Sequence, residues 1–163
     1  MLMKDALSYI RQILDSNDIR YNENEIADTY RFYMTFGLQK SKLSSINVIL
    51  NVTSDFDNPN ECTRIESYAF IGIKADESCM AEMGEFLHRA NYGMIFGCFE
   101  MDYDDGEIRF KMSINCDGTF PSREVIESLW YIPAIMADRY GNGILAVSLG
   151  LASAQETIEK IES

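Results

Sequence analysis

The sequence predicts an α+β domain in which helices pack on a five-stranded antiparallel sheet. In five segments apolar and polar residues alternate, which is the period of a strand with one buried face. In other segments apolar residues recur every three or four positions, as on one side of an amphipathic helix. The strand segments are grouped rather than interleaved with helices, which favours hairpin links and antiparallel pairing. We therefore expect one domain over residues 1–163, with the order α-β-β-β-α-β-β-α-α.

The N-terminal part predicts a helix followed by a pair of strands. Apolar residues have helical spacing over residues 2–14, and Asn17-Asp18 then ends the helix. Residues 19–30 are polar, and we interpret them as a connector with a short extended piece near its start. The period changes to two over residues 30–38 and again over Ser45–Thr53, so these segments are expected to form a hairpin.

The third strand is predicted over Arg64–Lys74, and it differs from its neighbours because both of its faces are apolar. Residues 54–61, which precede it, form a loop rich in Asp, Asn and Pro. This loop lacks the glycine and the distal glutamate of an EF-hand, so we do not expect it to bind calcium. The second helix is capped by Asp76 or Ser78 and ends at residues 91–93.

Residues 94–116 predict a hairpin most clearly. Two alternating runs meet at Asp105-Gly106, a dipeptide that suits the positive φ angles of a two-residue type I′ turn. The expected pairs are Tyr103 with Ile108, Asp102 with Arg109, Met101 with Phe110, Glu100 with Lys111 and Phe99 with Met112. Opposite charges then share one face and apolar residues share the other. Because the cations neutralise two of its carboxylates, we expect the acidic tip to be solvated and not to bind metal.

The C-terminal part predicts helices after Ser122, which is placed as an N-cap. Residues 129–137 are apolar on every side, so this helix must be covered on more than one side. Pro133 is expected to kink it, and Gly141-Asn142-Gly143 is expected to break it. Residues 153–156 match a capping box and open a last, polar helix.

The composition excludes several classes of function. The chain has 26 acidic and 14 basic residues, and its net charge of −12 repels phosphate backbones and anionic membranes. No uncharged apolar run approaches the roughly 20 residues that span a bilayer, and the N-terminus lacks the apolar stretch of a signal peptide. We therefore expect a cytoplasmic protein that binds neither nucleic acid nor membranes.

The sequence contains no motif for catalysis, cofactor binding or metal binding. It has no nucleophile elbow, phosphate-binding loop, dinucleotide-binding glycine motif or H-E-x-x-H. Its four cysteines are widely and irregularly spaced, and His88 is its single histidine, which does not suit zinc. We therefore predict no catalytic, cofactor-binding or metal-binding residues, no cofactor and no enzymatic activity.

The sequence also predicts an excess of apolar side chains on strand faces that point away from the main core. Soluble domains seldom leave such patches bare. Either the terminal helices cover them, or they form a homodimer interface or a groove for a client segment. The all-round apolar helix contributes one further residue to this surface. The candidate residues are Tyr68, Phe70, Met94, Phe96, Cys98 and Trp130.

Two segments resemble the YbjN family of bacterial proteins. They are residues 86–114, FLHRANYGMIFGCFEMDYDDGEIRFKMSI, and residues 137–140, ADRY. Family members have a similar helix end, two strands around an Asp-Gly turn and a long helix. The resemblance implies a fold like that of type III secretion chaperones, which are often dimeric and acidic and bind extended client segments without nucleotide. YbjN-like proteins are described as sensory transduction regulators, and the family supplies no catalytic residues.

These observations together predict a non-catalytic protein-binding module, chaperone-like or regulatory, that acts as a homodimer. Its partner would be another protein or a second copy of the chain. One alternative is a small-molecule-binding sensor or an enzyme, with a pocket between the sheet and the helices. Another is a structural subunit of a larger assembly.

Overall fold

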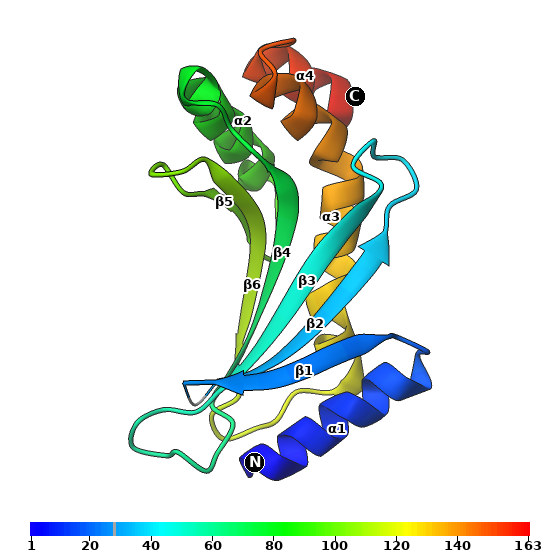
Figure 1. The fold of residues 1–163 in the computed structure, drawn as a ribbon, viewed down its shortest axis with the longest axis vertical. Coiled ribbons are helices and arrows are strands. Elements are labelled where there is room, and N and C mark those ends of the chain that lie inside the picture. The colour runs from blue at the N-terminus through cyan, green and yellow to red at the C-terminus, as the bar shows by residue number, and fades with distance from the viewer. Residues whose placement is uncertain (28) are drawn as a thin grey trace.

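The computed structural model describes residues 1–27 and 29–163 (Figure 1). The helices are α1 (Met3–Ser16), α2 (Met80–Tyr92), α3 (Arg123–Ser148) and α4 (Ala154–Glu162), with a short 3-10 helix, η1 (Glu77–Cys79), before α2. The strands are β1 (Tyr21–Ile26), β2 (Thr29–Gly37), β3 (Ser45–Thr53), β4 (Arg64–Lys74), β5 (Cys98–Met101) and β6 (Glu107–Asn115). The α+β class and the antiparallel sheet are confirmed.

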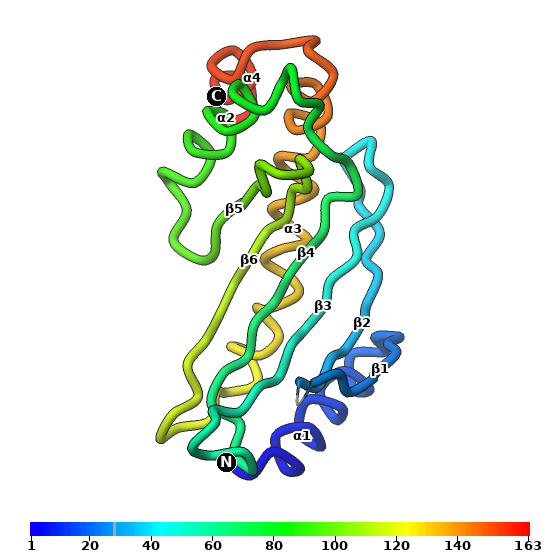
Figure 2. The backbone as a smooth tube through the Cα atoms, turned by 60° about the vertical axis from the view of Figure 1, so that its left-hand side comes forward, coloured from blue at the N-terminus to red at the C-terminus, as the bar shows by residue number. Residues whose placement is uncertain are grey.

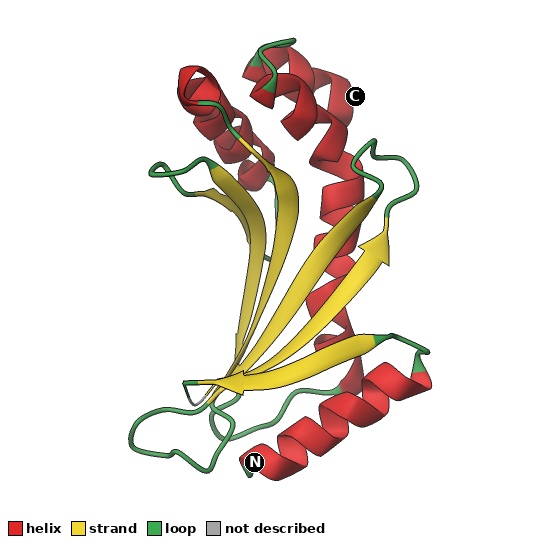
Figure 3. Ribbon diagram, in the orientation of Figure 1, coloured by secondary structure: helices red, strands yellow, loops and turns green. Residues whose placement is uncertain are grey.

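The sheet has six strands in the order β1-β2-β3-β4-β6-β5, so the prediction of five strands is wrong (Figure 3). The additional strand, β1, lies within residues 19–30, which were predicted to be a connector, and pairs antiparallel with β2. Its sequence, YNENEI, is almost entirely exposed and shows no alternation of buried and exposed positions. Asn and Glu are depleted in strands, but charged residues are common on sheet edges, where β1 lies.

The helices lie on one face of this sheet. Helix α3 runs along the side of β3, β4 and β6 that carries their buried residues (Figures 1 and 2). Helices α2 and α4 pack on each other at one end of the molecule, and α1 lies beside β1 at the other. The opposite face of the sheet, which we call the outer face, carries no helix from the described part of the chain. None of the described helices is long and apolar enough to cross a membrane.

Helix α3 continues through Gly141-Asn142-Gly143, where the sequence predicted a break. Both glycines are buried at close contacts between elements. A Cβ atom at Gly141 would lie 2.8 Å from the side chain of Leu43, and one at Gly143 would lie 2.8 Å from the ring of Phe86. These glycines therefore allow α3 to approach the β2–β3 connection and α2 closely, and the helix tolerates them because packing compensates for their low propensity.

The β5–β6 hairpin forms, but the predicted register is wrong by two residues. Phe99 pairs with Phe110, and Glu100 pairs with Arg109. The connection is not a two-residue turn, because the Gly106 N–H donates to the Asp102 carbonyl at 2.8 Å and closes a longer loop. Only Gly106 has the positive φ angle that the predicted turn requires at two positions. Since the register differs by an even number, every side chain stays on its predicted face.

The predicted N-cap residues occupy the helix starts, but their side chains do not all form the expected capping hydrogen bonds. The capping box at Ser153 and Glu156 is confirmed. Ser122 is the N-cap residue of α3, but its hydroxyl accepts no backbone N–H of the helix and instead donates to the Glu124 carboxylate at 2.7 Å. Asp76 accepts from the Ser78 N–H at 3.0 Å and caps η1, which leads into α2.

Candidate protein-binding surface

The strand register places the outward side chains of the outer face in rows that cross the sheet. The central row contains Cys98, Lys111, Tyr68, Ile49, Tyr33 and Asn22. The next row contains Glu100, Arg109, Phe70, Asn47 and Thr35. Most of these residues are partly exposed, whereas their neighbours along each strand are buried on the helix side. Two of the strand residues predicted for a partner surface, Tyr68 and Phe70, therefore lie side by side in adjacent rows.

Tyr68 lies at the centre of the outer face, between two cations. The guanidinium carbon of Arg109 is 4.7 Å from its ring centroid, and the ammonium nitrogen of Lys111 is 5.7 Å from it. The Tyr68 hydroxyl donates to the Glu66 carboxylate at 3.2 Å. Burial, assisted by the charge of Glu66, raises the pKa of Tyr68, so the hydroxyl stays a donor. The ring and its cations thus form one ordered contact patch.

The two cations beside Tyr68 share a single carboxylate. The Arg109 guanidinium donates to Glu100 at 2.9 Å, and the Lys111 ammonium lies 3.7 Å from the same side chain. These residues are partly exposed, so the pairs contribute little to stability. Together with Glu66, Glu100 balances the two cations around Tyr68, so this part of the outer face is close to neutral, although the chain as a whole is strongly acidic.

The outer face also has a shallow hollow of about 450 Å³ beside Phe70. Its rim is polar, with the Thr35 hydroxyl donating to the Asn47 amide oxygen at 2.9 Å. Its remaining walls come from β1, β2 and β3, including Asn22, Tyr33 and Ile49. An apolar floor with fixed polar groups around it suits a side chain from a partner protein.

Both edges of the sheet carry features that oppose the addition of a further strand. At β5, the Asn91 side chain donates to the Phe99 carbonyl at 2.9 Å and accepts from the Phe99 N–H at 2.8 Å. A side-chain amide thus takes the place of a neighbouring strand. At the other edge, Glu23 and Glu25 of β1 are exposed charges, which discourage strand addition. A partner is therefore expected on the outer face rather than at an edge.

The connection between α2 and β5 contributes exposed apolar side chains at the β5 end of the sheet. Phe96, predicted as a strand residue, lies in this connection and is 61% exposed. Ile95 and Tyr92, which the sequence analysis did not select, are more exposed still. Met94 is partly buried against the core. Their exposure depends on how the chain turns after α2, and no residue pattern specifies that turn.

Trp130 does not belong to this surface, because it is fully buried within the core. The sequence could not separate the sides of a helix that is apolar all round. In the structure Leu129, Trp130 and Pro133 are buried, whereas Tyr131 and Ile135 are 42% and 58% exposed. The exposed residues of this stretch are therefore Tyr131 and Ile135.

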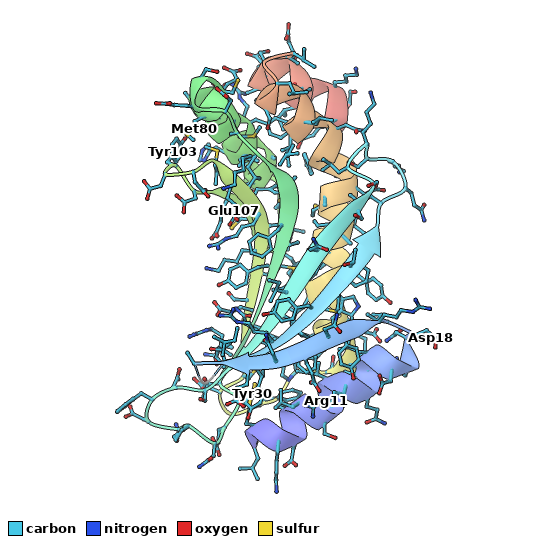
Figure 4. All side chains as sticks on the ribbon, in the orientation of Figure 1. Arg11, Asp18, Tyr30, Met80, Tyr103 and Glu107 are labelled. Atoms are coloured by element: carbon cyan, nitrogen blue, oxygen red, sulfur yellow. The ribbon has the colours of Figure 1, made fainter. Side chains whose placement is uncertain are left out.

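The acidic hairpin tip borders a hollow of about 970 Å³ at the start of α2. Tyr103 and Met80 lie close together here (Figure 4). Asp105 pairs with Lys74, and Asp102 accepts from the Asp104 N–H at 2.8 Å, so these carboxylates hold the loop. The predicted pairing of Asp102 with Arg109 is wrong, since Arg109 binds Glu100.

No group of three or more His, Cys, Asp or Glu side chains within the described residues is placed to hold a metal ion. All four cysteines are free thiols. Cys62 and Cys116 are buried together, and their mutual hydrogen bond raises the pKa of Cys62 and lowers that of Cys116.

The fold and this surface define an α+β protein with one helix-covered sheet face and one bare, partly aromatic sheet face. Neither a protein-family model nor a curated protein sequence matches the chain. The resemblance to the YbjN family therefore remains a prediction.

Proposed function

We propose that the protein is a non-catalytic protein-binding module, chaperone-like or regulatory, that acts as a homodimer through the outer face and the adjoining α2–β5 connection. Membership of the YbjN family, a bacterial origin and a cytoplasmic location are parts of the same proposal. The partner is a protein or a second copy of the chain. No cofactor takes part in this function.

The observation that carries the proposal is the central row of the outer face, with Tyr68 held between Arg109 and Lys111. Tyrosine and arginine are enriched in protein interfaces, where a rigid aromatic ring gives a large contact at low entropic cost. Six strands have five spacings between them, and at about 4.8 Å per spacing the face is about 24 Å wide. Exposed Phe96 and Ile95 extend it with apolar surface.

The test is the oligomeric state of Phe96→Asp, measured by sedimentation equilibrium. Because Phe96 is already exposed, the variant is expected to fold normally. An aspartate buried in an apolar contact loses its solvation, so we expect the dimer dissociation constant to rise at least tenfold. Phe56→Asp is the matched control, since Phe56 is 100% exposed in the loop before β4 and should not affect assembly.

Two outcomes would contradict the proposal. A wild-type chain that stays monomeric up to high concentration and retains no partner in pull-downs has no protein-binding role of this kind. A folded Phe96→Asp variant that assembles as tightly as Phe56→Asp would remove the α2–β5 connection from the interface.

A further inference from the structure

A second apolar surface lies along α3, on the side that borders the β2–β3 connection and α4. Tyr131 and Ile135 are exposed on α3, and Leu149 and Leu151, just beyond its end, are 61% and 75% exposed. Tyr131 and Leu149 are about 27 Å apart along the helix axis at 1.5 Å per residue. The stripe between them therefore spans about five turns of helix.

This stripe forms the floor of a continuous groove. One hollow of about 870 Å³ lies between α3 and the β2–β3 connection, and a second of about 790 Å³ lies between α3 and α4. The two hollows share Arg139, Asn142 and Ile161, so they form one depression. We call it the α3 groove. Its apolar lining is Phe36, Leu38, Tyr131, Ala134, Ile135, Leu145, Ala146, Leu149, Leu151, Ala152 and Ile161.

Four cations surround the α3 groove in this otherwise acidic chain. Lys40 and Lys42 come from the β2–β3 connection, Arg139 from α3 and Lys160 from α4. All four are exposed. Within residues 1–27 and 29–163, none of them forms an ion pair. The groove lining therefore has four cations against two carboxylates, Asp138 and Glu156, which leaves an excess of positive charge.

The two carboxylates that line the α3 groove are already bound locally. Asp138 accepts from the backbone N–H groups of Lys40 and Ser41, at 2.7 and 2.9 Å. Burial by itself would raise the pKa of Asp138, but these backbone donors outweigh it and hold that pKa below its ordinary value. Glu156 accepts from the Ser153 hydroxyl at 2.8 Å in the capping box of α4.

The loop that carries Lys40 and Lys42 is fixed against α3. Besides the bonds to Asp138, the Asn142 side chain accepts from the Lys42 N–H at 2.8 Å and donates to the Lys40 carbonyl at 3.0 Å. The backbone that carries Lys40 and Lys42 is therefore held in place before any partner binds, which lowers the entropic cost of binding.

We infer that the α3 groove binds an acidic amphipathic helix of another protein. The apolar floor fits residues spaced at i, i+4 and i+7 on such a helix, and the basic rim fits carboxylates flanking them. A helix from a second copy fits less well, because α1, α2 and α4 already bury their apolar sides in the core. An anionic membrane fits less well too, since its surface is wider than the α3 groove and would also face the acidic remainder of a chain with a net charge of −12.

The probe is a fluorescein-labelled 18-residue helical peptide with leucines on one side and glutamates flanking them. A second peptide has lysine at every glutamate position. Fluorescence anisotropy at low ionic strength gives the affinity of the full chain for each. We expect the acidic peptide to bind saturably and the lysine peptide not to bind. High salt should weaken the binding of the acidic peptide, because it screens exposed charges.

The decisive variant is Lys42→Glu combined with Arg139→Glu, for which we expect at least tenfold weaker binding of the acidic peptide. Its control is Lys4→Glu combined with Arg20→Glu, which makes the same charge change at two other exposed cations and should alter affinity less than twofold. If the first variant unfolds, Leu151→Glu tests the apolar floor instead, at an exposed position that tolerates substitution.

Five results would overturn the inference, four from the peptide and variant experiments and one from lipid vesicles. The first four are no saturable binding to the wild type, equal loss in both charge variants, equal binding of the lysine peptide, and a groove variant that dissociates a dimer while no peptide binds. Pelleting of the wild type with anionic lipid vesicles, in the absence of peptide binding, would also overturn it. Phe96→Asp should leave peptide affinity unchanged, so failure of this inference is distinguishable from failure of the homodimer proposal.

Discussion

Replacing Asn91 tests how the edge of the sheet is closed. In Asn91→Ala, the Phe99 N–H and carbonyl both lose a partner that lies at 2.8 and 2.9 Å in the native protein. A buried hydrogen bond contributes about 1 kcal/mol, and leaving its backbone partner unsatisfied raises the cost. We therefore expect a loss of about 2 kcal/mol in the free energy of unfolding. At this chain length that loss lowers Tm by about 4–8 °C.

The isosteric change Asn91→Asp separates the hydrogen bonds from the packing. The introduced carboxylate can still accept from the Phe99 N–H, but it repels the Phe99 carbonyl, which raises its pKa in the folded state. A group with a raised folded pKa destabilises the protein above that pKa, and the destabilisation disappears below the unfolded value of about 3.9. The Tm difference from wild type should therefore be large at pH 7 and small near pH 4.

The assay is thermal unfolding followed by circular dichroism, with wild type and variant compared at each pH. Light scattering on the same samples should show more association for Asn91→Ala, because its unpaired edge can accept a strand. A Tm within 1 °C of wild type would refute the idea that Asn91 closes the edge. A pH-independent difference for Asn91→Asp would show that the hydrogen-bond geometry is not the cause.

Three further predictions follow from packing and charge. Gly143→Ala places a Cβ within 2.8 Å of Phe86 and Thr157 and should destabilise by about 1–3 kcal/mol in urea unfolding, whereas Gly37→Ala, which meets nothing within 4 Å, should not. Asp138→Ala should cost about 1–3 kcal/mol at pH 7. Because the folded pKa of Asp138 is lowered, its contribution is complete above about pH 4 and is lost as the pH falls through that folded pKa, so wild type and variant should converge in acid unfolding. In Lys160→Glu, the acidic peptide should bind more weakly, and Tm should fall by no more than about 4 °C, because the residue is exposed and the change reverses one charge in the last turn of α4.

The sequence predicts the elements whose burial pattern is regular, and the errors occur where neighbouring segments decide the structure. Strand β1 was not predicted, because an edge strand with exposed Asn and Glu has no buried face and therefore no alternation of apolar and polar residues. The glycines of α3 looked like a break because the close contacts of Gly141 and Gly143 involve residues far away in the chain. The faces of the hairpin strands could be predicted from the alternation of residues. Its turn could not, because the loop is closed by a hydrogen bond from the Gly106 N–H to the Asp102 carbonyl that no residue pattern specifies.

The two candidate surfaces also differ in how far their residues could be predicted from the sequence. Tyr68 and Phe70 could be selected because strand alternation places them on one face. The cations of the α3 groove could not, since Lys42 and Arg139 are nearly a hundred positions apart and only the folded helix brings them together. Asp138 and Asn142 give a partial signal, because polar side chains within an otherwise apolar helix need partners.

The positions of the two surfaces make their proposed roles compatible. The outer face points away from α3, and the α3 groove lies between that helix, the β2–β3 connection and α4, on the helix-covered side of the sheet. A two-fold dimer formed through the outer face would leave one α3 groove open on each chain. Such a dimer would bind one acidic helix per chain, and two linked helices would bind with increased avidity when their linker spans both grooves. If the dimer instead bound one peptide per two chains, both grooves would have to meet at the two-fold axis and form one site, and the outer face could not be the dimer interface by itself.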